Sequence, residues 1–255
     1  MTDQQRIVSR RSVLTGLGCA GSILVTGCTA SEPPTYGNVL RMADNLTYRT
    51  QRLLLPTHAL AREYTRGDIS AIPAIGTTNP SDPKQAGSEQ NAARYEGLRR
   101  REFADWRLQV EGSVARPASF SLTDLKSFPE RTQITKHTCE EGWSAIAEWT
   151  GVPLSQVLTA CGILPQARFV NFFAFDDTSD SIDMFDALHP QTLLAYGMNG
   201  RDLPIAHGAP LRLRVERQLG MKMLKYLHRI VVTDHFFDPG EQGPLAIGWA
   251  WYFGI

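Results

Sequence analysis

The chain has 255 residues, with 26 basic and 26 acidic side chains, so its formal net charge is zero. This balance excludes the broad basic surface that nucleic acid or an anionic membrane attracts. The length is ample for one large domain with a buried core. Basic residues therefore matter only where they cluster.

Residues 1–30 have the layout of an export signal. The twin-arginine pair Arg10–Arg11 precedes a moderately apolar segment, Val13–Gly27, which is too short to span a membrane. The run VTGC, ending at Cys28, resembles a lipoprotein cleavage box, whose cysteine becomes the acylated first residue. We expect a periplasmic protein exported by the twin-arginine route, either anchored through an acylated Cys28 or released by ordinary signal cleavage.

Residues 31–100 are expected to wrap around the domain that follows. Between Asn38 and Thr65, leucines and arginines form an amphipathic pattern that Pro56 interrupts, which predicts two short helices. The segment from 76 to 97 is rich in Pro, Ser, Asn and Gly and lacks an apolar period, so it predicts a surface loop. The main domain is expected over residues 101–235.

Within this domain, capping signals predict two helices. Ser121 and Asp124 have the spacing of a capping box, and Pro129 ends the helix that they begin. Pro153 and Gly162 bracket a second helix. Alternating or β-rich runs predict strands at 106–110, 133–138, 168–175, 193–198, 211–215 and 226–232.

A hairpin turn is predicted at Asn199–Gly200, directly after the strand that ends at Met198. Strands outnumber helices and do not alternate with them regularly. The sequence therefore predicts a single mixed α+β domain, mainly β with short helices, rather than a doubly wound fold.

Cys139 directly follows a predicted strand, a usual place for site residues. Beyond the signal segment the other cysteines are Cys28 and Cys161, and no CxxC pair occurs, which excludes covalent haem, a dithiol motif and a four-cysteine zinc site. From the residues alone, Cys139 has three possible roles: metal ligand, nucleophile, or partner of Cys161 in a disulfide.

Five runs in order resemble the molybdopterin-binding domain of the sulfite oxidase family: TCEEGW, WTGVPL, LLAYGMNGRDLP, HGAPLRL and GMKMLKYLHRIVVTD. The resemblance covers about Arg101 to Asp234 and implies a sulfite-oxidase-type domain holding molybdenum-molybdopterin. It implies that Cys139 ligates the metal, since molybdenum bound to dithiolene sulfurs accepts a further soft ligand. Cys161 is then expected to be a small core residue.

The resemblance also implies which residues bind the pterin and its phosphate. The matching basic residues are His207, Arg212, Lys222 and Lys225. Asp176 stands where many relatives carry an Asp-Gly turn that contacts the pterin, but Asp177 replaces the glycine here, so either carboxylate could match. An N-terminal segment of relatives also touches the cofactor, and it corresponds here to Tyr48, Arg49 and Arg52, for which surface salt bridges are the alternative.

Glu141 indicates the type of reaction. Sulfite-oxidising relatives place basic residues shortly after the cysteine, whereas Glu140 and Glu141 would repel a sulfite anion. Bacterial relatives that include methionine sulfoxide reductases carry a similar Cys-x-Glu-x-Trp run. We therefore expect Cys139 and Glu141 to be catalytic in the reduction of a neutral oxide such as a sulfoxide. The alternatives are oxidation of sulfite or a similar anion, and a non-catalytic envelope module that binds a ligand.

Electrons are expected from a membrane haem or quinol-linked subunit, because the chain has no haem or iron–sulfur motif. The aromatic C-terminal residues 236–255 are expected to pack across the domain, and a docking surface for that redox partner is the alternative. We expect a monomer or a complex with the membrane partner, and no nucleic-acid ligand.

Overall fold

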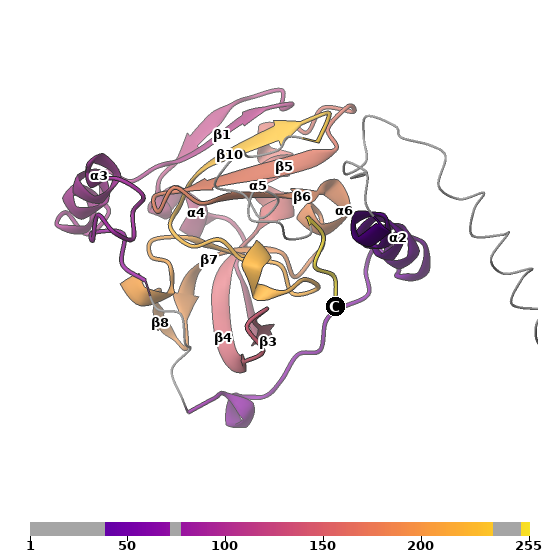
Figure 1. Cartoon of the computed structure of the whole chain (residues 1–255). Helices are drawn as coiled ribbons and strands as arrows, with labels where there is room; N and C mark the ends of the chain where they lie inside the picture. The colour runs from indigo at the N-terminus through magenta and orange to yellow at the C-terminus, as the bar shows by residue number, and fades with distance from the viewer. Residues whose placement is uncertain (1–38, 72–77, 237–250) are drawn as a thin grey trace, which may run out of the picture.

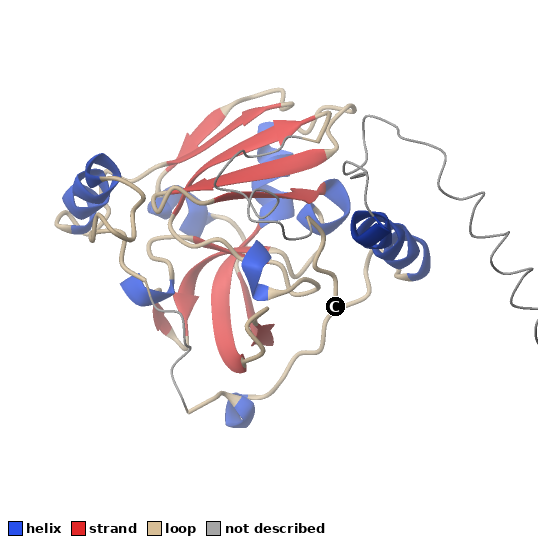
Figure 2. Ribbon diagram, in the orientation of Figure 1, coloured by secondary structure: helices blue, strands red, loops and turns tan. Residues whose placement is uncertain are grey.

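The computed structural model describes residues 39–71, 78–236 and 251–255, which form two five-stranded sheets with short helices at their margins (Figures 1 and 2). The twin-arginine pair, Cys28 and Trp249 lie outside the described residues. Among the described helices, none is both long and apolar enough to cross a membrane. The predicted α+β class, mainly β, is confirmed.

The first sheet has the strand order β2-β1-β10-β5-β6. β1 and β10 pair in parallel, and the other neighbours pair antiparallel. The bounds are β1 Leu108–Gly112, β2 Ala118–Phe120, β5 Phe169–Ala174, β6 Ser179–Asp183 and β10 Leu227–Thr233. This sheet lies above the second one in Figure 1.

The second sheet has the order β3-β4-β7-β8, and β9 pairs with β7. Its bounds are β3 Arg131–Thr138, β4 Ser144–Pro153, β7 Leu193–Met198, β8 Arg201–Asp202 and β9 Arg212–Arg214. Asn199 and Gly200 both have positive φ, 52° and 72°, and join β7 to β8 as the sequence predicted. This turn brings the β7–β8 end beside the functional site described below.

The core lies between the two sheets and receives one face of each. Phe172 and Ile230 enter it from the first sheet, and Val152 and Leu194 from the second. Helix α5 (Leu154–Cys161) adds Leu158, and Gly162 ends this helix in the left-handed region, at φ 74°. Helix α4 (Leu122–Ser127) begins with the predicted capping box.

Two predictions for the N-terminal third are wrong. Within the described residues 39–65 there is only one α-helix, α2 (Val39–Leu54), since the chain after Pro56 contains no further α-helix before a short 3-10 helix, Arg66–Asp68. The expected loop 76–97 contains most of helix α3 (Glu89–Arg99). Ser88 caps this helix by accepting from Asn91 N at 3.1 Å, and Tyr95 is fully buried, so capping and tertiary packing outweigh the polar composition.

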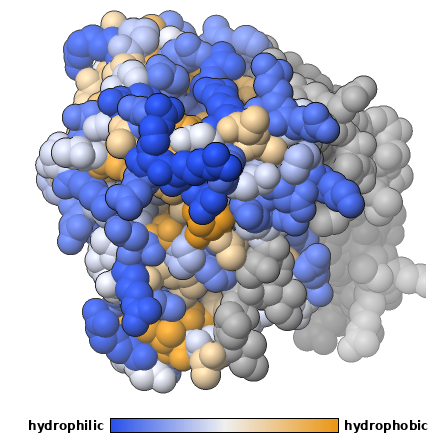
Figure 3. Space-filling model, turned by 90° about the vertical axis from the view of Figure 1, so that its left-hand side faces the viewer, coloured by the Kyte–Doolittle hydropathy of each residue, from blue (hydrophilic) through white to orange (hydrophobic). Residues whose placement is uncertain are grey.

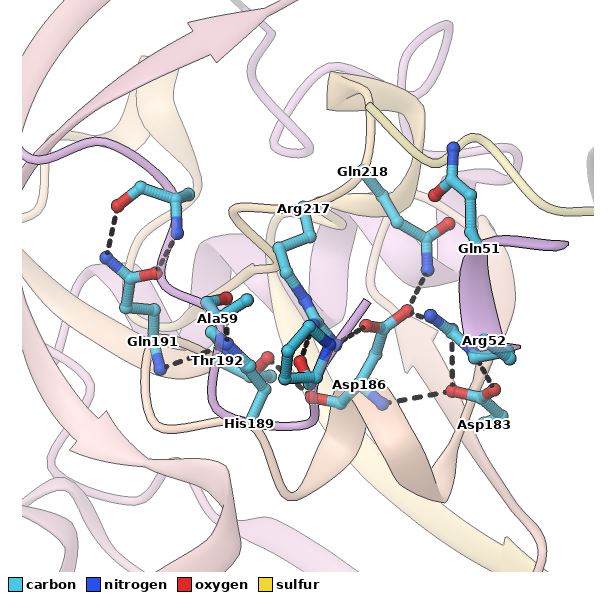
Figure 4. A network of polar contacts seen from close by, with 12 residues as sticks. Gln51, Arg52, Ala59, Asp183, Asp186, His189, Gln191, Thr192, Arg217 and Gln218 are labelled. Carbon is cyan, nitrogen blue, oxygen red and sulfur yellow. Dashed lines mark hydrogen bonds and ion pairs between the residues drawn. The ribbon is translucent and has the colours of Figure 1, made fainter. Parts of the chain in front are cut away.

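A buried polar network fastens α2 to the domain (Figure 4). Arg52 donates to Asp183 at 2.8 Å and to Asp186 at 2.6 Å. Asp186 also accepts from Arg217 at 2.8 Å and from Gln218. The extended segment after α2 is held in the same region, where His189 Nε2 lies 3.0 Å from Ala59 O.

The end of the chain closes over α2. Trp251 and Tyr252 are buried, and both rings lie edge-on to Tyr48, with centroids 5.4 and 5.2 Å away. Trp251 Nε1 donates to Ser181 Oγ at 2.7 Å. The predicted packing of the tail is therefore confirmed for residues 251–255, and these two buried rings do not form an exposed docking surface.

Candidate active site

A cleft of about 670 Å³ opens where β3 ends. Its walls come from the turn 139–143, the first half of β4, the β7–β8 turn and the chain from 204 to 225. Ser70, in the extended N-terminal segment, closes another side and is fixed by backbone and side-chain hydrogen bonds with Ile146. Segments far apart in the sequence thus meet at one site.

Cys139 is held in a tight turn at one end of this cleft. Its N–H donates to Trp143 O at 2.9 Å, and its carbonyl accepts from Gly142 N at 3.1 Å. Gly142 has φ 90°, which favours glycine. Glu141 Oε2 lies 3.8 Å from Cys139 Sγ and accepts from Trp143 Nε1 at 2.9 Å. The turn therefore fixes a carboxylate beside the thiol.

The surroundings of Cys139 favour the neutral thiol. Burial raises its pKa to about 11, and the carboxylates of Glu140 and Glu141 act in the same direction. Glu140 Oε2 is itself buried without a hydrogen-bond partner. A bound cation reverses this balance, because metal coordination deprotonates a thiol and neutralises nearby carboxylates.

The floor of the cleft is cationic. Arg212 and Arg214 both lie over the ring of Trp149, at 4.8 and 4.3 Å from its centroid. Arg212 donates to the carbonyls of His207 and Met223, at 3.0 and 3.2 Å. Burial, with the neighbouring Arg214, lowers the pKa of Arg212 to about 9.

Two further basic groups line the same end of the cleft. Burial, with the charge of Arg212, lowers the pKa of Lys225 to about 8. Lys225 Nζ donates to Thr78 Oγ1 at 3.2 Å. Burial also lowers the pKa of His207, and Arg212 and Lys225 add to this shift. An anionic group placed here would relieve the repulsion among these cations.

The structure brings together half of the predicted site residues: Cys139, Glu141, His207, Arg212 and Lys225 all line the cleft. Lys222 does not line it. Its ammonium forms a fully buried ion pair with Asp180 of β6, because the short 3-10 helix Gly220–Lys222 turns this side chain toward the first sheet.

The remaining predicted cofactor contacts also lie outside the cleft. Asp176 accepts from Thr178, and Asp177 occupies the β5–β6 turn with φ 63°. A separate hollow beside Asp183 is lined by three predicted residues, Tyr48, Arg49 and Arg52. Arg52 forms salt bridges, as in the alternative for this segment, but they are buried and do not lie on the surface.

Several cleft residues were not predicted from the sequence: Ser70, His137, Trp149, Asn199 and Arg201. A signal existed for His137, which stands two residues before Cys139 at the end of the same predicted strand. Asn199 was interpreted only as a turn residue. Ser70 carried no signal, because its position depends on how the N-terminal segment docks.

The disulfide alternative for Cys139 is wrong, since Cys139 and Cys161 are both free. Cys161 is 1% exposed at the end of α5 and packs in the core, as predicted. Cys139 is thus available to a ligand in the cleft.

The cleft fits an anionic cofactor that carries a metal. Two buried donors on its floor, Arg212 Nε and Trp149 Nε1, have no hydrogen-bond partner, and neither has the buried acceptor Glu140 Oε2 beside Cys139. Unpaired buried polar atoms are costly, so they indicate a ligand at this position. The donors would hold anionic and polar cofactor atoms, and Cys139 would supply the thiolate to the metal.

Residues 96–239 match the family described as "Oxidoreductase molybdopterin binding domain". The chain belongs to this family. It is therefore an oxidoreductase whose cofactor is molybdopterin, and its fold is of the sulfite oxidase type, as the resemblance implied.

Relatives include a "Putative protein-methionine-sulfoxide reductase subunit YedZ1" of Azospira oryzae, 33% identical over 98% of this chain and 87% of that protein. A "Protein-methionine-sulfoxide reductase catalytic subunit MsrP" of Xanthomonas axonopodis pv. citri is 26% identical over 95% of this chain and 78% of that protein. Among solved structures, the sulfane dehydrogenase SoxCD of Paracoccus pantotrophus has 27% sequence identity and a TM-score of 0.49, and the match covers 51% of this chain and 38% of that one.

Proposed function

We propose that this protein is an exported molybdopterin oxidoreductase that reduces a neutral oxide, most specifically a sulfoxide such as methionine sulfoxide. Two relatives bear names of protein-methionine-sulfoxide reductase subunits. The observation that carries the proposal is the acidic turn, in which the Glu141 carboxylate lies 3.8 Å from Cys139 Sγ.

Each residue of the cleft has a role in this proposal. When bound, molybdopterin supplies a molybdenum centre whose two-electron redox change accompanies transfer of an oxygen atom. Cys139 would give its thiolate to the metal. Arg212, His207 and Lys225 would hold the anionic end of the cofactor. Glu141, whose Oε2 accepts from Trp143 Nε1, would relay from solvent the two protons that the departing oxygen needs to leave as water.

Oxidation of sulfite is the competing reaction, and the charges near Cys139 oppose it. Glu140 and Glu141 both lie in the turn beside the thiol, so an approaching dianion meets two carboxylates. A neutral sulfoxide carries no net charge and meets no such repulsion. The acidic turn therefore supports the sulfoxide over sulfite.

The electron donor in this proposal is a membrane haem or quinol-linked subunit, and the apolar surface around α2 supports this. Among the described residues, the large apolar side chains with high exposure are Leu46, Leu53, Leu54, Leu60, Leu188 and Ile255. Hydrogen bonds place these apolar side chains in one region. Arg217 donates to Pro56 O, and the carbonyl of Arg217 accepts from Ile255 N. His189, next to Leu188, contacts Ala59 O, next to Leu60. The face in Figure 3, on the other side of the molecule, is mainly hydrophilic. Apolar patches of this kind mark partner surfaces.

A metal and substrate survey tests the proposal. Protein matured in a molybdenum-replete host should contain about one molybdenum per chain, and a reduced viologen should drive reduction of sulfoxides by this protein. Cys139→Ser should lose metal and activity together, while Cys161→Ser, in the core, should keep both. Cytochrome c reduction driven by sulfite, with no sulfoxide turnover, would replace the proposal by sulfite oxidation. Metal-free protein that still binds a ligand would favour the envelope binding module.

A further inference from the structure

A buried chain of polar contacts ends on His137, a residue of the cleft with no role in the function proposed above. Glu216 accepts two hydrogen bonds from Arg214, at 2.9 and 2.7 Å, and a third from Gln133 at 3.0 Å. Both charged side chains are almost completely buried, with 0% and 1% exposure. Arg214 Nη1 then lies 2.9 Å from His137 Nδ1. The buried ion pair thus places the Arg214 guanidinium against one nitrogen of the His137 imidazole.

This contact determines where His137 carries its proton. A guanidinium has only donors, so Arg214 donates and His137 Nδ1 accepts. The ring proton therefore resides on Nε2. Met223 Sδ, 3.2 Å from the same Nδ1, has no proton to give and contacts the ring by packing. Glu216 and Arg214 hold His137 as a neutral imidazole with Nε2–H as its donor.

The Nε2 end of the ring lies against Gly220, which lines the cleft. His137 and Cys139 line the cleft as well. The ring passes so close to Gly220 that a Cβ there would lie 2.5 Å from Cε1 and Nε2. Among the residues that the structure describes, none accepts a hydrogen bond from Nε2.

We propose that His137 is a further molybdopterin-binding residue, whose Nε2–H donates to an acceptor atom of the cofactor, and that Arg214 and Glu216 are positioning residues for this contact. His137 is a neutral donor beside the charged Arg212, because the guanidinium of Arg214 donates to its Nδ1. The inference depends on cofactor binding by the family and is independent of which oxide is reduced.

Cofactor retention in the holoenzyme tests this inference. His137→Met removes the donor at similar volume, and His137→Gln keeps an N–H donor. Release of molybdenum and pterin after dilution should be about tenfold faster in His137→Met, and much closer to wild type in His137→Gln, because a hydrogen bond to a polar cofactor atom is lost only in the first. Equal release rates in all three proteins, at equal thermal stability, would make His137 a packing residue only.

The positioning role is tested by the tautomer itself. ¹⁵N NMR of histidine-labelled holoenzyme should show His137 with an unprotonated Nδ1 and a protonated Nε2. The double variant Arg214→Met/Glu216→Gln removes both buried charges, so it leaves neither one uncompensated. It should show a mixture of tautomers and release the cofactor faster, by about tenfold. A protonated Nδ1 in the wild type would overturn the inference.

These outcomes are separate from those of the proposed function. A wild-type protein that holds molybdenum but reduces no sulfoxide would contradict the proposed reaction. The comparison of cofactor release between wild type and the His137 variants would still test the role of His137. A metal-loaded enzyme that reduces sulfoxides, with unchanged retention in His137→Met, would contradict only the present inference.

Discussion

At the scale of single residues, the cleft contains charges of both signs. The carboxylates of Glu140 and Glu141 lie in the turn of Cys139, and the basic residues Arg212, His207 and Lys225 line the same cleft. A cofactor that carries both a cationic metal and a phosphate would compensate charges of both signs.

Lys225 makes cofactor retention depend on pH. Its pKa is about 8 in the fold and about 10.5 in an unfolded chain. A phosphate contact needs the ammonium, so we expect cofactor affinity to fall above pH 8, by up to about tenfold per pH unit, until the higher pKa of Lys225 in the bound state is reached. In the cofactor-free protein the sign is opposite, since between about pH 8 and 10.5 the unfolded chain binds more protons and stability rises with pH. Dissociation constants of the cofactor and thermal unfolding of the cofactor-free protein, measured from pH 7 to 10, check both; Lys225→Met should flatten both profiles.

Glu141 should control the choice of substrate. Glu141→Gln keeps the size of the side chain and removes its charge and its proton-transfer capacity. We expect sulfoxide reduction to fall by about 10² or more, and inhibition by sulfite to strengthen. Steady-state rates with a viologen donor measure the first effect, and sulfite titrations the second. Trp143→Phe, which removes only the hydrogen bond that orients Glu141, should lower the rate less; equal losses would assign the effect to geometry instead of charge.

At the scale of secondary structure, Arg52 forms buried ion pairs that attach α2 to the domain. Arg52 donates to both Asp183 and Asp186, and both carboxylates are almost fully buried. Arg52→Met would leave Asp183 without its cation, so we expect a loss of about 3 kcal/mol in the free energy of unfolding. Urea denaturation measures it. Leu53→Ser on the same helix, 84% exposed, should change stability by less than about 0.5 kcal/mol.

The sequence predicted elements that local chemistry defines. The capping box at Ser121 and the Asn199–Gly200 turn form as expected, because each depends on residues within four positions. Helix α3 was missed, because its stability depends on Tyr95, which is fully buried and donates to Ala209 O at 2.6 Å. Strand β4 was missed as well, since it lies between β3 and β7 and its ends are set by pairing.

The residues of the candidate site also fall into those that local sequence predicts and those that depend on tertiary packing. Motif order located Cys139, Glu141, His207, Arg212 and Lys225, because these positions are tied to short runs of sequence. Spacing alone does not give the direction of a side chain, and Lys222 shows the consequence: it is three residues from Lys225 and points to Asp180 on the other sheet. The partners of such residues are known only after the sheets are packed.

At the scale of the whole molecule, the site and the apolar surface around α2 involve different faces. The cleft opens at the second sheet, among β3, β4 and the β7–β8 turn. The exposed leucines lie on α2 and just after it, and α2 is separated from β8 in Figure 1 by the breadth of the fold. In the proposed function, a substrate can therefore reach the cleft while the electron donor covers α2.

This arrangement predicts that donor docking and chemistry can be separated by mutation. The triple variant Leu46→Ser/Leu53→Ser/Leu54→Ser changes side chains that are 57%, 84% and 69% exposed, so the fold should persist. We expect the turnover driven by the membrane donor to fall by about tenfold, and the turnover driven by viologen to stay the same, because only the donor needs the apolar surface. Paired assays on membranes and on purified protein measure the two rates.

The matched control lies at the other end of the molecule. Arg101→Ser, just beyond α3, changes a side chain that is 64% exposed and should leave both rates unchanged. If the leucine variant keeps its full rate with the membrane donor, the donor docks elsewhere. If it loses the viologen-driven rate as well, the leucines support activity by stabilising the folded protein and not by docking the donor. A viologen reaches the cleft without a docking surface.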